Sequence, residues 1–145
     1  MSNGMFQRAV YDGLWSLLAE TLAEQQRLIQ DAWELPDLVA YDAPEHHERM
    51  HTIRAIIEVY TEAQREIIRA CGQGWYSSNE ARWLYLSCVQ HMEWHHTYAN
   101  RPFRGEGESL IAYQRDRHDT FLRAHLWARL IRKVKPIYEA SKAAR

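Results

Sequence analysis

Residues 42–74 read DAPEHHERMHTIRAIIEVYTEAQREIIRACGQG and contain the start, the apolar face and the end of one long helix. Asp42 can accept a hydrogen bond from a free amide of the first turn, where Pro44 is tolerated because that amide position needs no partner. Two glycines close the stretch. A helix over residues 43–71 is therefore predicted. Its apolar face consists of Met50, Ile53, Ile56, Ile57, Tyr60, Ile67, Ile68 and Cys71.

Three further stretches show the same helical periodicity, and short segments with proline or glycine separate them. They predict helices over residues 5–34, 78–99 and 108–143, with a kink or a separate terminal helix at Pro136. Because the connections are short, neighbouring helices should run mostly antiparallel. The sequence thus predicts an all-α fold, a single-domain bundle of about four mostly antiparallel helices spanning residues 1–145.

The composition is that of one globular domain. A chain of 145 residues with 46% hydrophobic and 26% charged side chains can bury a single core. The N-terminus lacks the pattern of a signal peptide, and no run of about 18 apolar residues occurs. Cys71 and Cys88 lie within apolar helical patterns, which indicates buried thiols in a reducing compartment. We therefore expect a cytoplasmic protein that does not span a membrane.

Charge is distributed unevenly along the chain, although the formal net charge is only −1. Residues 1–100 carry 7 basic and 14 acidic side chains, whereas residues 101–145 carry 11 and 5. The basic segment either attracts a macromolecular partner with an acidic surface or forms ion pairs with the three acidic helices. Since no nucleic-acid-binding motif occurs, a protein is favoured over a nucleic acid as the partner.

Six tryptophans and eight tyrosines are many for this length, and such side chains often anchor interfaces. Trp83 and Trp94 lie on the far side of their helix from its apolar face, and Trp127 leaves the face of the last helix. Burial between helices, or contact within an oligomer, would explain the same pattern. The candidate partner-binding residues are Arg101, Arg104, Arg129, Arg132, Lys133, Lys135, Trp83, Trp94 and Trp127.

Histidines are also numerous, and two imidazoles four residues apart on a helix can bind one metal ion. His91 and His95 match the His-x-x-x-His helix of hemerythrins, although the other ligand motifs of that family are missing. Such a cluster could hold zinc, iron or haem, and its alternative is ordinary packing of neutral imidazoles. A helical wheel turns five histidines toward the bundle interior: His46, His91, His95, His118 and His125.

Carboxylates give this metal hypothesis little support on the same wheel. The two Glu-x-x-His strings that begin at Glu48 and Glu93 resemble those of di-iron carboxylate bundles, yet both glutamates point to water. Glu20 and Glu24 lie at the edge of the apolar stripe of the first helix or outside it. A ferritin-like centre is therefore disfavoured.

No catalytic motif occurs: the sequence lacks a glycine-rich phosphate loop, a nucleophile elbow and a Cys-x-x-Cys pair. We assign no catalytic residues, and the sequence favours a protein that is not an enzyme. Our first hypothesis is a small binding or regulatory protein without a cofactor, such as an inhibitor, that acts through its basic C-terminal segment and exposed aromatics. The second is a metal-binding bundle with a histidine cluster.

Overall fold

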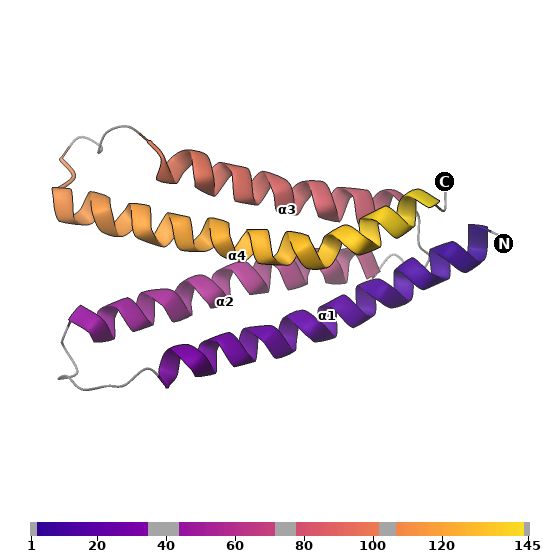
Figure 1. Ribbon diagram of the computed structural model, residues 1–145, viewed down its shortest axis with the longest axis horizontal. Helices are drawn as coiled ribbons and strands as arrows, with labels where there is room; N and C mark the ends of the chain where they lie inside the picture. Colours follow the sequence, from indigo (N-terminus) through magenta and orange to yellow (C-terminus); the bar gives the residue numbers. More distant parts are fainter. Residues whose placement is uncertain (1–2, 35–43, 72–77, 102–106, 144–145) are drawn as a thin grey trace.

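The computed structural model is a bundle of four α-helices and describes residues 3–34, 44–71, 78–101 and 107–143 (Figure 1). Neighbouring helices run antiparallel, and both ends of the chain lie at the same end of the bundle. The predicted all-α fold is confirmed, whereas the predicted helix start at Asp42 lies outside the described residues. The helices are α1 (Asn3–Trp33), α2 (Pro44–Cys71), α3 (Ser78–Ala99) and α4 (Leu110–Ala143).

The four helices form two hairpins that share a core. Helix α1 packs along α2, and α3 packs along α4. Helix α4 also contacts α1 and α2, whereas α2 and α3 touch each other only lightly. Helix α4 is therefore the central element, and the contact between α2 and α3 is the slightest of those between neighbouring helices. No helix among the described residues is long and apolar enough to cross a lipid bilayer.

The core is built from side chains that recur every three or four residues on each helix. Burial of a large apolar side chain contributes about 1.5–3 kcal/mol, so this set supplies most of the driving force for folding. Its members include Leu14 and Leu17 of α1, Tyr60 and Ile67 of α2, Leu84 and Cys88 of α3, and Trp127, Leu130 and Val134 of α4.

Two predicted apolar faces differ from the observed ones. The apolar pattern of residues 108–143 predicts a core face with Leu110, Ile111, Phe121, Leu122 and Ala128, but Leu110 and Ile111 are exposed. The buried face of α4 instead carries Ala124, Trp127, Leu130 and Val134, so the apolar pattern placed the centre of this face wrongly. Three residues of the predicted α2 face are also exposed, because they lie on the side of α2 that the other described helices do not cover: Met50, Ile57 and Ile68.

Helix α4 begins at a local signal and bends near its end. Gly107 adopts a φ of 76°, and the Ser109 hydroxyl accepts a 3.1 Å hydrogen bond from the Ala112 amide of the first turn. The helix continues through Pro136 as one element, so a separate terminal helix does not form. Figure 1 shows its last part turning away from the direction of the first, as expected where proline lacks an amide donor.

Candidate functional site

The predicted partner-binding cations are largely paired within the protein. Arg101 lies 2.9 Å from a carboxylate oxygen of Glu108. Arg129 and Lys133 of α4 both contact Glu24 of α1. The basic C-terminal segment thus forms ion pairs with the acidic part of the chain, which was one of its two interpretations. Of the other predicted cations, Arg132 and Lys135 are exposed on α4, and Arg104 lies outside the described residues.

The three tryptophans predicted to bind a partner differ in their surroundings. Trp83 is 66% exposed and Trp94 is 61% exposed, as their position on the wheel indicates. Trp127 is only 1% exposed, so its assignment to a binding surface is wrong. The reason is the misplaced face of α4: Trp127 lies at the centre of the true buried face, one turn from Ala124 and Leu130.

Trp83, Trp94 and Tyr98 form what we call the α3 aromatic stripe. Their spacing places all three on one side of α3. The rings of Trp94 and Tyr98 stack, with centroids 5.6 Å apart and planes 5° apart. Ser87, one turn after Trp83, donates a 2.7 Å hydrogen bond to Glu66 of α2. The stripe therefore runs beside the contact between α2 and α3.

A buried carboxylate joins three helices in what we call the Glu24 layer. Glu24 is 6% exposed, and the Tyr60 hydroxyl of α2 donates a hydrogen bond to its Oε1. From α4, Arg129 Nε lies 3.3 Å from Oε1 and Lys133 Nζ lies 3.1 Å from Oε2. Glu24, Arg129 and Lys133, with Arg132, line a pocket of about 230 Å³. The prediction that Glu24 lies at or beyond the edge of the apolar stripe is wrong, because this side chain is buried in the bundle. Arg129 and Lys133 make that burial possible by compensating its negative charge.

Electrostatics keep the Glu24 layer charged at neutral pH. Burial raises the pKa of Glu24, but the hydrogen bond from Tyr60 and the charges of Lys133 and Arg129 outweigh it, so the net pKa is lowered. Burial raises the pKa of Tyr60, and the neighbouring Glu24 raises it further. Glu24 is thus ionised and Tyr60 protonated, which makes the layer a satisfied ion-pair network rather than a reactive centre.

The structure does not bring the five candidate histidines together. His118 and His125 are exposed on α4, so the prediction that they point inward is wrong. The error has the same origin as that for Trp127, namely the misplaced face of α4. The side chain of His46 lies outside the described residues. Two candidates remain half-buried on α3, His91 and His95.

His95 is held in its neutral form. Burial lowers its pKa, and the charge of Arg123 and the neighbouring His91 lower it further. Its Nδ1 is buried and accepts or donates no hydrogen bond within the described part of the chain. His95 therefore behaves as a core imidazole.

His91, in contrast, meets two carboxylates that the sequence analysis did not single out. Its Nε2 lies 3.4 Å from Oε1 of Glu66. One ligand atom each of Glu62, Glu66 and His91 lie within 4.8 Å of one another, and we call this group the Glu62–Glu66–His91 cluster. Glu62 and His91 have 35% of their side chains exposed and Glu66 has 12%, so solvent reaches the cluster.

Neighbouring side chains orient this cluster. The Ser87 hydroxyl donates to Glu66, and the His91 ring stacks on buried Trp127 with centroids 4.2 Å apart. Cys88 lies one turn before His91, but burial and then the charge of Glu66 raise its pKa to about 12, which leaves an inert thiol. A sequence signal did exist: Glu62 and Glu66 are four residues apart, as are Ser87 and His91.

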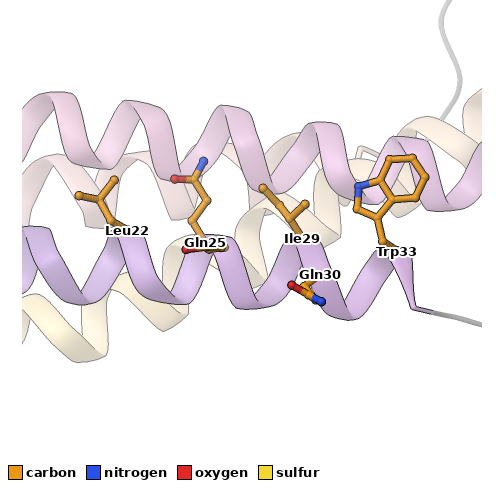
Figure 2. Close-up of a pocket in the computed structure, with 6 residues that line it drawn as sticks. Leu22, Gln25, Ile29, Gln30 and Trp33 are labelled. Carbon is orange, nitrogen blue, oxygen red and sulfur yellow. The ribbon is translucent and has the colours of Figure 1, made fainter.

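An apolar groove of about 510 Å³ runs along α1 (Figure 2). Leu22, Ile29 and Trp33 line it together with three glutamines. One of these, Gln25, accepts a 2.7 Å hydrogen bond from Gln64 and so ties the groove to α2. The side chains that line the groove carry no formal charge, so it offers apolar and amide contacts only.

Comparison with known proteins assigns no function to these features. The chain matches no family model, no curated protein and no solved structure. Function is therefore inferred from the geometry of the described residues. Two features of the described residues are candidates for binding. The α3 aromatic stripe exposes large aromatic side chains, and the Glu62–Glu66–His91 cluster brings three possible metal ligands together.

Proposed function

We propose that this protein is a non-catalytic helical bundle that binds another protein through the α3 aromatic stripe. The observation that carries the proposal is the exposure of Trp83 and Trp94, more than 60% each, on a helix whose other side is buried. A tryptophan offers roughly 150–250 Å² of contact area and is enriched among the residues that dominate binding energy. Two of them on one helix face are the core of a small interface.

The stripe is partly ordered before any partner arrives. The stacked rings of Trp94 and Tyr98 restrict each other's rotation. The edge of the Trp94 ring also contacts His95, with centroids 5.0 Å apart. Ordering a side chain on binding costs about 0.5–1.5 kcal/mol, so rings that already pack together lose less. The packed rings therefore lower the entropic cost of binding a partner at the stripe.

A protein suits the stripe better than a nucleic acid does. The charged residues that precede the two tryptophans in the chain have opposite signs, Arg82 and Glu93, and both are exposed. Such a surface lacks the cluster of cations that phosphates require. Arg129 and Lys133 do not add to it, because they lie against Glu24 of α1.

Exposed cations of α4 give the partner a second, weaker contact in this proposal. Arg132 and Lys135 are exposed and fit an acidic part of a partner's surface. The two free cysteines are buried, which fits a reducing compartment, and we place the binding in the cytoplasm. A role as regulator or inhibitor follows from binding without catalysis.

The test places a photo-crosslinking phenylalanine derivative at Trp83 or Trp94 in the cells that produce the protein. Trp15, which is exposed on α1, is the control position. We expect both α3 positions to crosslink the same polypeptide and the control position to leave it unlabelled. Crosslinking of that polypeptide from Trp15 alone would overturn the proposal, and so would a second copy of the chain as its sole product.

Binding to the purified partner then measures the contribution of the stripe. Truncation of an interface tryptophan commonly costs about 2 kcal/mol or more, which is roughly 30-fold in affinity. The double variant Trp83→Ser with Trp94→Ser should therefore lose at least that factor, while Trp33→Ser on α1 should bind normally. If instead Arg132→Glu with Lys135→Glu abolished binding and the tryptophan variants did not, the partner would sit on α4.

A further inference from the structure

We infer that the Glu62–Glu66–His91 cluster binds one divalent transition-metal ion, and that Zn²⁺ is the ion that fits it. The site joins α2 to α3 at the junction where these helices otherwise touch lightly. The inference does not rest on the proposed protein partner. It replaces the all-histidine site expected from the sequence with one imidazole and two carboxylates.

The distances match the size of a metal site. Two ligands of a tetrahedral zinc ion, with bonds of about 2.0–2.1 Å, lie roughly 3.3–3.4 Å apart. His91 Nε2 and Glu66 Oε1 already lie 3.4 Å apart. The third ligand atom, from Glu62, completes a set within 4.8 Å, and the Glu62 side chain is 35% exposed, which leaves it room to adjust toward an ion.

Glu66 supplies a second, independent observation. Its Oε2 is buried and accepts no hydrogen bond from any described residue. A buried carboxylate oxygen without a partner is expensive, and a cation that Glu66 bound through both of its oxygens would satisfy it. Glu62 brings a second carboxylate to the same place, and a divalent ion balances the charge of the pair. Glu62 meets Arg65 through its Oε2 at 3.0 Å, which leaves its other oxygen for a metal.

The donor types select the metal. Imidazole nitrogen with carboxylate oxygen suits zinc and its first-row neighbours, whereas magnesium and calcium prefer sites made of oxygen alone. Cys88 is too deeply buried to contribute a thiolate. Three protein ligands at a partly exposed site leave a fourth position for water, the arrangement found in zinc sites that keep an exchangeable ligand.

Surrounding contacts hold the ligands in place. Ser87 donates to Glu66 and fixes its carboxylate, while Trp127 stacks on the His91 ring at 4.2 Å with planes 3° apart. Such outer contacts typically change metal affinity by about 10–100-fold when removed. Ser87 is therefore a positioning residue in this inference, and it does not touch the ion.

The experiment titrates the untagged, chelator-stripped full chain with Zn²⁺ by calorimetry and repeats the titration with Co²⁺ while recording the visible spectrum. We expect one ion per chain, a four-coordinate cobalt spectrum without thiolate bands, and a melting temperature that Zn²⁺ raises and a chelator restores. Glu66→Gln and His91→Gln should each weaken binding more than tenfold, and Ser87→Ala about tenfold. Circular dichroism verifies that each variant is folded.

Matched controls separate this site from its alternatives. Glu93→Gln on α3 and His125→Gln on α4 remove exposed ligand-type side chains and should leave the affinity unchanged. Binding that His95→Gln abolishes and Glu66→Gln spares would overturn the assignment in favour of a histidine pair. Failure of the wild-type chain to bind a stoichiometric ion would show that Glu66 and His91 form only a hydrogen bond. Glu62→Gln keeps the test decisive if Glu66→Gln does not fold, because Glu62 is more exposed.

Discussion

Replacing Glu24 with glutamine should destabilise the protein by about 2 kcal/mol. Glutamine keeps the shape of the side chain and still offers an oxygen to the Tyr60 hydroxyl, so the loss is confined to the ion pairs with Arg129 and Lys133 and to a longer, exposed one with Arg27 at 3.8 Å. A buried hydrogen bond to a charged group contributes about 1.5–3 kcal/mol, and an exposed ion pair about 0–1. Arg129 and Lys133 are 34% and 29% exposed, which places each contact near 1 kcal/mol.

Urea unfolding followed by circular dichroism measures this difference, and Glu20→Gln, on the exposed side of α1, is the control. For a chain of this length, a loss of about 2 kcal/mol lowers the melting temperature by roughly 6 °C. The lowered pKa of Glu24 stabilises the fold above the ordinary carboxyl value of 4.5, and this contribution disappears as the pH falls through the folded value. The difference in the free energy of unfolding between wild type and variant should therefore disappear at acidic pH. A variant within about 0.5 kcal/mol of wild type at neutral pH would refute the reasoning, because that is the range of an ordinary surface substitution.

Two further predictions concern aromatic burial and proton linkage. Trp127→Ala should cost about 3–5 kcal/mol in urea unfolding, whereas Trp83→Ala should change stability by less than about 0.5 kcal/mol. Burial lowers the pKa of His95 below 6.5, so the unfolded chain takes up a proton first and wild-type stability falls as the pH drops below that value. The urea midpoint of His95→Gln should decline less over the same range; equal declines would contradict a neutral buried imidazole.

The helices could be read from the sequence, but not every one of their faces. Periodicity and the proline and glycine breaks gave α2 and α3 almost to the residue, because these signals act within a few positions of the chain. The face of α4 depends on which side meets the other helices. Leu110 and Ile111 are exposed there while Ala124 is buried, and no local rule distinguishes them.

The same limit applies to the candidate sites. Exposure of Trp83 and Trp94 was predictable, because both lie opposite a narrow apolar face of one helix. The Glu62–Glu66–His91 cluster combines two helices, so it depends on their relative rotation and alignment, which hydrophobic patterns leave undetermined. Our search for carboxylate ligands considered Glu-x-x-His strings on single helices and therefore missed a pair whose histidine lies across the junction.

The Glu24 layer also decides how α1 is aligned along its neighbours. Apolar positions of α1 repeat at seven residues, as with the buried Val10 and Leu17, so shape alone would tolerate a slide of α1 by seven positions. Such a slide would carry Glu24 away from Tyr60 and Lys133 and bury its charge among apolar side chains, at a penalty of several kcal/mol. It would also set Leu17 or the shorter Asp31 in its place. One polar contact thus distinguishes alignments that the apolar pattern treats as nearly equivalent.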